Sequence, residues 1–252
     1  MSTHRAAFLA RVPDDAGHVD LRGLLLSGRC SLYGEAEGGF VARSWEFPYA
    51  AAFGAPPAEV IRRAIAAAPP ATTSWAGEGR DGEWHLMADP ESDAAVAAAV
   101  PDWPRKEVVL HRWGGNPTRP VTPPGCDLRL APDGWREAGL HFGHLPVALR
   151  EEMESEWVAG RPLAAALVGG RVVSYCYAPV ETETLWDVSV DTLAEHRRRG
   201  LAAACFLALA RYLATRDRRP VWGAFADNAA SLALARRLGF QPAARLVSSI
   251  RP

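Results

Sequence analysis

The chain has almost no lysine and no closely paired cysteines. Of its 28 lysine and arginine residues only Lys106 is a lysine, a bias that we attribute to a GC-rich coding sequence. The cysteines, Cys30, Cys126, Cys176 and Cys205, are scattered and include no Cys-x-x-Cys pair. This spacing argues against a zinc site and against a disulfide framework. We therefore expect reduced thiols, no bound metal and a cytoplasmic protein.

A surplus of charge and long hydrophobic runs are also missing. The formal net charge is −1, so no basic excess indicates a nucleic acid or an anionic membrane as a partner. No run of about 18 apolar residues predicts a membrane-spanning helix. The N-terminal residues reach Pro13 without an apolar segment of signal-peptide length. We expect neither export nor membrane insertion.

A stretch rich in proline and glycine divides the chain. Residues 114–125 contain four prolines and three glycines, a composition that cannot sustain a helix or a central strand. At 252 residues and 48% hydrophobic content, the chain is long enough for two cores. We predict an N-terminal α+β domain over residues 1–113, a stiff linker over 114–125 and a second domain over 126–252.

Residues before the linker predict alternating helices and strands. Pro56 and Pro57 can open a helix, because proline is well tolerated in the first helical turn. Asp89 can cap a further short helix. The predicted helices are 20–26, 58–68 and 90–100, and the predicted strands are 39–45, 83–88 and 107–113.

The most informative motif joins an apolar strand to an alanine-rich helix. Residues 190–202 read Val-Asp-Thr-Leu-Ala-Glu-His-Arg-Arg-Arg-Gly-Leu-Ala. Main-chain N–H groups at a helix N-terminus lack intrahelical partners and carry a partial positive charge, so they bind phosphate oxygens. Gly200 and Ala202 keep the approach to these groups open, and the arginines 197–199 add positive charge beside them. The motif predicts a pyrophosphate site.

The spacing of these arginine, glycine and alanine residues resembles the acyl-CoA pyrophosphate motif of the GNAT superfamily of acetyltransferases. A second match lies downstream, where a predicted strand over 221–225 precedes Asn228 and Ser231. Together with Leu238-Gly239-Phe240, this segment is similar to the asparagine-bearing helix and the terminal Leu-Gly-Phe of that superfamily. The resemblance implies a two-domain type with a C-terminal GNAT domain.

The fold class that the resemblance implies is α/β (α+β). It has a mixed, mostly antiparallel sheet flanked by helices, and its fourth and fifth strands splay apart. Leu201, Cys205, Leu209 and Leu213 recur every four residues, which predicts one apolar helix face. In this half the predicted helices are 133–140, 146–157, 200–215 and one from 228, and the predicted strands are 127–130, 164–168, 172–178, 184–192, 221–225 and 243–250.

Acetyl-CoA is the acyl donor that the resemblance implies. Its pantetheine arm would bind main chain in the gap between the splayed strands, and its pyrophosphate would bind main chain at the glycine turn. Asn228 would face the cofactor, or would serve only as a helix N-cap, and both interpretations stay open. The implied cofactor-binding residues are Val190, Asp191, Thr192, Arg197, Arg198, Arg199, Gly200, Leu201, Ala202, Ala203 and Asn228.

Direct attack of an amine on a thioester needs a group that removes a proton from the amine. Relatives often place a glutamate near the start of the fourth strand, which makes Glu183 and Asp187 the candidate catalytic residues. Strand alternation puts these two carboxylates on one face and Trp186 and Val188 on the other, unless a bulge intervenes. Asp187 should be partly buried, and burial would raise its pKa toward a value useful for a base.

Two functions remain open at this point. One is an N-acetyltransferase acting by direct attack of a primary amine of a small molecule or peptide. The other is a non-catalytic acyl-CoA-binding or regulatory module, because many relatives protonate the leaving thiolate with a tyrosine where this chain has Ala235. A homodimer formed through the N-terminal domain fits either function. The acidic run of Glu151, Glu152, Glu154 and Glu156 would favour a cationic amine if it flanks the acceptor pocket.

Overall fold

The computed structural model describes residues 3–67, 83–116 and 118–252. Residue 68, the predicted end of one helix, and residue 117 of the predicted linker lie outside these ranges. The elements of the N-terminal half are α1 (Thr3–Arg11), α2 (Val19–Ser27), β1 (Cys30–Glu35), β2 (Gly39–Ser44), β3 (Tyr49–Phe53), α3 (Ala58–Ala66), β4 (Trp84–Ala88), α4 (Asp93–Ala99) and β5 (Arg105–Trp113). Local signals fix several ends: α2 stops at Gly28, whose φ of 75° suits a glycine cap.

The C-terminal half repeats this order of helices and strands after one additional strand. Its elements are β6 (Asp127–Ala131), α5 (Val147–Glu154), α6 (Glu156–Ala159), β7 (Leu163–Val168), β8 (Arg171–Tyr177), β9 (Leu185–Asp187), β10 (Ser189–Thr192), a 3-10 turn (Ala194–His196), α7 (Leu201–Ala214), β11 (Arg219–Phe225), α8 (Ala229–Arg237) and β12 (Phe240–Arg251). The third strand of the N-terminal half, β3, corresponds to the pair β9 and β10.

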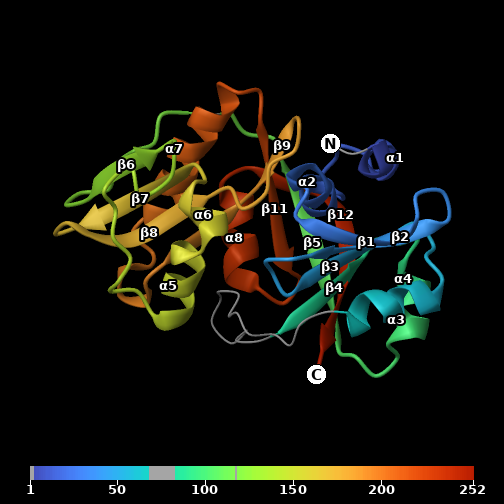
Figure 1. The fold of residues 1–252 in the computed structure, drawn as a ribbon. Helices are drawn as coiled ribbons and strands as arrows, with labels where there is room; N and C mark the ends of the chain where they lie inside the picture. Colours follow the sequence, from blue (N-terminus) through green and yellow to red (C-terminus); the bar gives the residue numbers. More distant parts are fainter. Residues whose placement is uncertain (1–2, 68–82, 117) are drawn as a thin grey trace.

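The two halves share one central sheet. Its eight strands follow the order β1-β2-β3-β4-β12-β5-β11-β9, and a second sheet has the order β10-β8-β7-β6 (Figure 1). The last strand of each half is inserted into the other half, because β12 lies between β4 and β5 while β5 lies between β12 and β11. The halves are therefore joined by main-chain hydrogen bonds as well as by side-chain packing.

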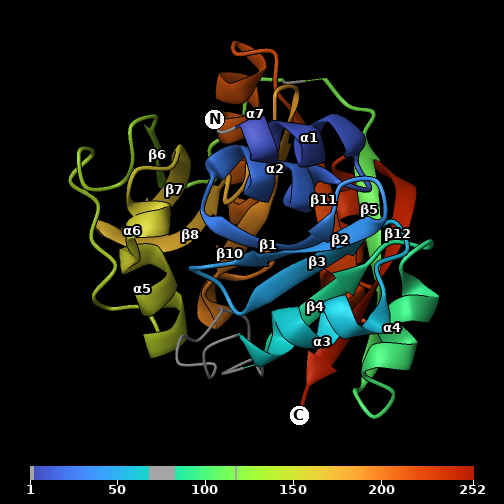
Figure 2. The ribbon, with the colours of Figure 1, turned by 45° about the vertical axis from the view of Figure 1, so that its right-hand side comes forward.

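Helices cover both faces of these sheets. In the N-terminal half, α1 and α2 pack on one face of the central sheet, whereas α3 and α4 pack on the other (Figure 2). In the C-terminal half, α7 covers one face of the four-stranded sheet and α5 and α6 cover the opposite face. The face that carries α5 and α6 is important for the candidate site described below.

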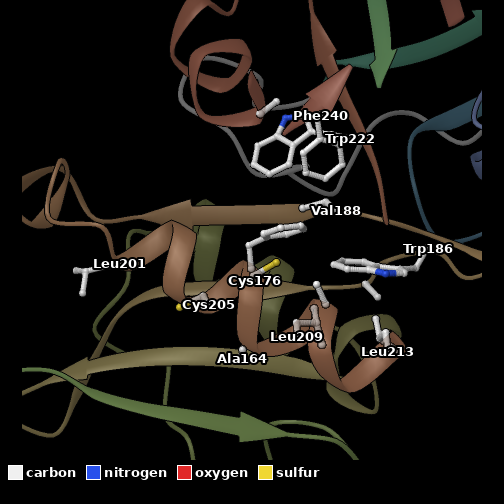
Figure 3. Packing of buried hydrophobic residues seen from close by; sticks show 14 of the residues in the cluster. Ala164, Cys176, Trp186, Val188, Leu201, Cys205, Leu209, Leu213, Trp222 and Phe240 are labelled. Atoms are coloured by element: carbon white, nitrogen blue, oxygen red, sulfur yellow. The ribbon is translucent and has the colours of Figure 1, made fainter. Parts of the chain in front are cut away.

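The apolar face predicted for α7 is confirmed. Leu201, Cys205, Leu209 and Leu213 are each at most 1% exposed. They pack in one cluster with Phe206 and with buried tryptophans of β9 and β11 (Figure 3). Burying each leucine contributes roughly 1.5–3 kcal/mol. This packing fixes the position of the turn at the start of α7.

One predicted helix is wrong, and another is confirmed only in two separate pieces. Residues 133–140 form turns, because Gly134 has a φ of 98° and a β-carbon there would lie 2.0 Å from the Ala159 carbonyl oxygen. The helix predicted over 146–157 is broken at Ser155, which has extended backbone and whose side chain accepts the Val158 N–H as the cap of α6. The spacing of apolar residues in the sequence indicated neither the turns at 133–140 nor the break at Ser155.

Candidate functional site

The strand predicted over 184–192 is divided between the two sheets. Its first part, β9, pairs in parallel with β11 from Leu185 opposite Arg219 to Asp187 opposite Val221. The Val188 N–H then donates to the Val221 carbonyl at 3.0 Å. Beyond this point β8 is the strand that pairs with β10 within the described residues, so β10 diverges from β11. The predicted splay of the fourth and fifth strands is confirmed.

The predicted pantetheine residues lie on β10 at the edge of this gap. Val190, Asp191 and Thr192 are half-buried. The Ser174 hydroxyl of β8 donates to the Asp191 carbonyl at 2.8 Å and contacts the Thr192 hydroxyl at 2.7 Å. These bonds secure β10 from one side. Because β10 ends its sheet, its other side can accept main-chain hydrogen bonds as an added strand would make them.

The predicted pyrophosphate turn is open to solvent. Arg197, Arg198, Arg199 and Gly200 are exposed, and the N-cap of α7 is Gly200, which has no side chain to cap the helix. Gly200 has a φ of 81°, and a β-carbon there would meet a single atom, of Pro123, at 4.0 Å. Arg198 also has a positive φ, 61°, and successive residues with such backbone are typical of main-chain concavities that bind anions.

Behind this turn the chain is firmly held. Leu201 is buried, so only its main chain belongs to the turn, whereas Ala202 and Ala203 are half-buried. The Arg197 guanidinium donates to the Thr192 carbonyl at 3.1 Å and thereby links the turn to β10. With free N–H groups, a helix dipole and arginines, the turn can bind a doubly charged phosphate group.

Asn228 is the N-cap of α8. Its side-chain oxygen accepts the Ser231 N–H at 3.1 Å. The Ser231 hydroxyl in turn accepts the Trp222 indole N–H at 2.9 Å, which ties α8 to β11. The capping interpretation is therefore confirmed for Asn228, and its cofactor role stays a prediction. Ala235 is fully buried, so the position of the missing tyrosine belongs to the core.

Asp187 lies on the face of β9 opposite the buried Trp186 and Val188, as strand alternation predicts. Burial and the neighbouring Asp20 of α2 raise its pKa well above the ordinary range. Burial raises the pKa of Asp20 to about 6. Tyr49 of β3 completes this group, since its pKa is raised by burial and by both carboxylates. Two residues of the N-terminal half thus adjoin the candidate base.

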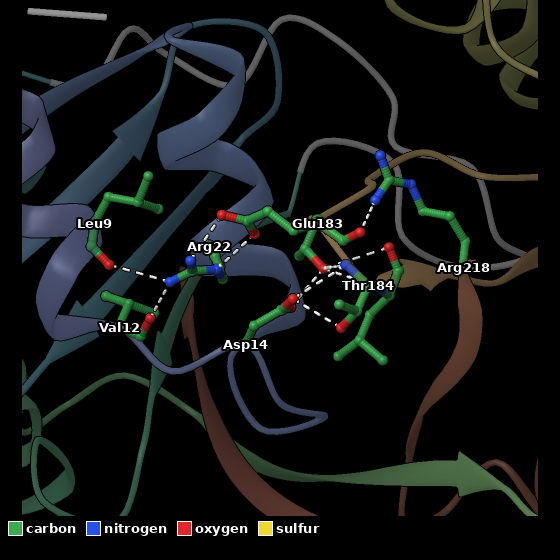
Figure 4. A network of polar contacts seen from close by, with 9 residues as sticks. Leu9, Val12, Asp14, Arg22, Glu183, Thr184 and Arg218 are labelled. Carbon is green, nitrogen blue, oxygen red and sulfur yellow. Dashed lines mark hydrogen bonds and ion pairs between the residues drawn. The ribbon is translucent and has the colours of Figure 1, made fainter. Parts of the chain in front are cut away.

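Glu183 lies in a different environment. Arg22 of α2 donates to both of its carboxylate oxygens at 2.7 Å, and this contact lowers the pKa of Glu183 (Figure 4). Asp14 accepts hydrogen bonds from the hydroxyls of Thr182 and Thr184 beside it. A carboxylate held ionised by a guanidinium is a weak proton acceptor. The contact instead fastens α2 to the loop that leads into β9.

A further polar cluster lies on the α5 face of the second sheet. The Tyr177 hydroxyl of β8 donates to one carboxylate oxygen of Glu152. Burial raises the pKa of Glu152 to about 8; the Tyr177 hydrogen bond opposes this shift, and Asp191 adds to it. Tyr175 lies two residues before Tyr177 and is 2% exposed. In the sequence Glu152 stands out only as part of an acidic run, because folding of distant segments brings the tyrosines to it.

The described residues contain neither a cluster of metal-binding side chains nor a membrane-spanning helix. No group of three or more His, Cys, Asp or Glu side chains in them is placed to hold a metal ion. None of their helices has both the length and the apolar character needed to span a bilayer. All four cysteines are free thiols.

Comparisons with known proteins agree with this geometry. Residues 164–246 match the family model described as GNAT acetyltransferase. The fold resembles a GCN5-related N-acetyltransferase-like protein from Streptococcus suis, with a TM-score of 0.62, 16% identity, and 98% of this chain and 100% of that chain covered. For a GCN5-related N-acetyltransferase from Kribbella flavida the TM-score is 0.58, the identity 17%, and the coverage 100% and 96%.

A third similar structure is a tandem GNAT protein from the clavulanic acid biosynthesis pathway, with a TM-score of 0.58, 18% identity, and 98% of this chain and 94% of that chain covered. No curated protein sequence matched the chain. At these identities the structural likenesses establish the fold. The predicted GNAT fold is confirmed, and the family model locates a GNAT domain in the C-terminal half.

Proposed function

We propose that this chain, with its GNAT acetyltransferase domain at residues 164–246, transfers an acetyl group from acetyl-CoA to a primary amine of a small molecule or peptide. The observation that carries the proposal is the combination of a strand gap with an uncapped helix start. The gap opens at Val188, and the exposed turn at Gly200 follows β10 directly. The thioester would lie where the gap opens, the pantetheine arm would follow β10, and the pyrophosphate would lie at the turn. The chain presents these three features in the same order as the cofactor presents its parts.

Acetyl-CoA would bind mainly to main-chain groups, from the gap at Val188 along β10 to the turn at Gly200. Val190, Asp191 and Thr192 would bind the pantetheine arm, and N–H groups from Arg198 to Ala203 would bind the pyrophosphate. The residues present fit these groups, because a side chain at Gly200 would project into open space where the phosphates would lie. Asn228 would contribute its amide nitrogen, since its oxygen already caps α8.

Asp187 is the group that we assign to accept the proton of the amine. The amine nitrogen forms a bond with the thioester carbonyl carbon, and one of its protons passes to the Asp187 carboxylate. The carbon–sulfur bond then breaks, and the sulfur leaves as the CoA thiol after taking up a proton. With its raised pKa, Asp187 would hold a proton near neutral pH better than Glu183, whose pKa is lowered.

The proton that the sulfur takes up would come from water or from protonated Asp187. Ala235 supplies no hydroxyl, and it is enclosed in the core. A thiol with a pKa of about 8.5 is a fair leaving group near neutral pH, so departure without a dedicated acid is chemically reasonable. The same feature supports the second candidate function, a module that binds acyl-CoA without turnover.

The N-terminal half would not bind a second cofactor. Its strands β3 and β4 stay paired from Tyr49 opposite His85 to Ala52 opposite Ala88, which leaves no gap between them. Its corresponding helix α3 begins after Pro56 and Pro57, and prolines offer no N–H group to a phosphate. We therefore expect one acyl-CoA for each chain.

Calorimetric titration with acetyl-CoA tests the proposal. Ala202→Glu places a carboxylate beside the phosphates without straining the helix, so it should weaken binding by more than about tenfold. Ala208→Glu, at a half-buried position farther along the same helix, should leave affinity unchanged. Wild-type protein that binds no acetyl-CoA, or equal effects of both variants, would overturn the cofactor site.

Turnover separates the enzyme from the binding module. Asp187→Asn should lower kcat by about a hundredfold, the scale of one general base, and leave acetyl-CoA affinity intact. Binding of acetyl-CoA without acetylation of any amine in a broad screen would favour the module.

A further inference from the structure

Acidic side chains follow the same face of β9 and β10. Trp186, Val188 and Val190 pack toward α7, so Asp187 and Asp191 project from the opposite side. Asp187 there adjoins Asp20 of α2, whereas Asp191 shares the α5-covered face of the second sheet with Tyr175. In the pairing of β10 with β8, Asp191 lies directly opposite Tyr175. Side chains that face each other in this way have β-carbons about 5 Å apart. Asp191 and the hydroxyl-bearing Tyr175 therefore belong to one cluster.

This cluster contains polar atoms that its own residues do not satisfy. One oxygen of Glu152 accepts from Tyr177, but its other oxygen, Oε2, is buried and has no hydrogen-bond partner among the described residues. The Tyr175 hydroxyl is likewise buried, and nothing in the described ranges bonds to it. Glu152 is 8% exposed and Tyr175 is 2% exposed. Buried groups without partners are rare in native proteins.

A donor that carries positive charge would satisfy both of these atoms. Burial, Asp191 and Glu152 raise the pKa of Tyr175, and burial and Asp191 raise the pKa of Glu152. In the part of the chain that the structure describes, no ion pair includes Glu152. An ammonium group provides three donors and one positive charge. It could serve Glu152 and Tyr175 together.

We propose that the acceptor is a diamine or polyamine, and that Glu152, Tyr175 and Asp191 bind the ammonium group that is not acetylated. The inference rests on the proposed function, because Asp187 marks where the reacting amine would lie. Asp187 and Asp191 are four residues apart, which corresponds to roughly 13 Å along an extended strand. An extended aliphatic chain between two amines can span such a distance.

Calorimetry with defined amines tests this subsite apart from catalysis. The probes are linear alkyl diamines of increasing length, each paired with the alkyl monoamine of equal length, titrated into protein saturated with CoA. The diamine should bind at least about tenfold more tightly than its monoamine at the best length, as expected for a charge-assisted hydrogen bond.

Two variants and a matched control assign the effect to residues. Tyr175→Phe removes only an unpartnered hydroxyl and keeps the packing, and Glu152→Gln keeps the Tyr177 contact. Each should lower diamine affinity by about tenfold and leave monoamine affinity within about twofold. Glu154→Gln removes a charge from an exposed position on the same helix and should change neither affinity.

The outcomes distinguish this inference from the proposed function. Equal affinity for diamines and monoamines at every length, or diamine affinity unchanged in Tyr175→Phe and Glu152→Gln, would overturn the ammonium subsite even if acetyl-CoA binds and monoamines are acetylated. Failure to bind acetyl-CoA would overturn the proposed function instead. Even in that case, diamine binding that depends on Glu152 and Tyr175 would identify an ammonium site.

Discussion

Asp187 and Asp20 are two carboxylates close together, contributed by different halves of the chain. Both are partly exposed, and among the described residues neither forms an ion pair with an arginine or lysine. Each carboxylate disfavours ionisation of its neighbour, so a proton is held more tightly than by either group alone. For a base this is useful, because a carboxylate with its ordinary pKa returns a captured proton too easily near neutral pH.

Asp20→Asn should therefore shift the pH dependence of catalysis to lower pH. Asp187 accepts a proton only while ionised, so kcat/KM falls when the pH drops below its raised pKa. Asparagine removes the repulsion from Asp20, which lowers the pKa of Asp187 and moves this acidic decline downward. The kcat/KM profile across the acidic range measures the shift. Asp15→Asn, a nearby exposed carboxylate, should leave the profile unchanged; an identical profile for Asp20→Asn would exclude the coupling.

At the scale of single elements, α2 positions the loop that carries Asp187. Gly23 of α2 lies so close to this loop that a β-carbon would come within 2.0 Å of a Val180 methyl carbon and 3.1 Å of the Glu181 carbonyl oxygen. The Val180 carbonyl in turn accepts the Asp187 N–H at 2.9 Å. The Arg22–Glu183 ion pair secures the same contact one residue away. A helix of the first half thus sets the geometry of the site in the second half.

Gly23→Ala should consequently damage both stability and activity. Overpacking against Val180 should cost about 1–3 kcal/mol of unfolding free energy, and displacement of the loop should lower kcat. Urea unfolding and steady-state kinetics measure these two effects. Gly38→Ala is the control, because a β-carbon there meets no atom within 4 Å, and it should stay within about 0.5 kcal/mol of wild type. Equal stability of both variants would show that α2 does not pack this tightly.

Local signals in the sequence predict the elements around the candidate cofactor site. The period of α7, the cap at Asn228 and the glycine turn at Gly200 each depend on a few neighbouring residues, and the structure has them where predicted. Asp20 and Tyr175 could not be found in this way, since pairing between distant segments brings them to the site. The same holds for the turns at residues 133–140, where a close approach to Ala159 decides the backbone.

At the scale of the whole molecule, the exchange of β5 and β12 makes each half depend on the other. β11 hydrogen-bonds to β5 along Val221–Phe225, and β12 does so along most of its length. Without β5, the C-terminal half would expose the inner edges of both strands together with apolar side chains such as Phe240. The GNAT domain is therefore incomplete as a separate piece.

A fragment of residues 126–252 should accordingly fail to fold alone. We expect no cooperative unfolding transition in its thermal melt and no binding of acetyl-CoA, whereas the intact chain unfolds in one transition. Mixing the fragment with residues 1–125 should restore cofactor binding, because the mixture again contains β5. A fragment that melts cooperatively and binds acetyl-CoA by itself would contradict this dependence.

The position of β12 also has a consequence for biosynthesis. A ribosome makes the chain from the N-terminus, so β4 and β5 emerge long before the strand that separates them. Until β12 leaves the exit tunnel, the central sheet has two open edges and can pair with other chains. The first half, although made earlier, must wait for β12 before its sheet can close. We expect newly made protein to need protection from aggregation until β12 has been made.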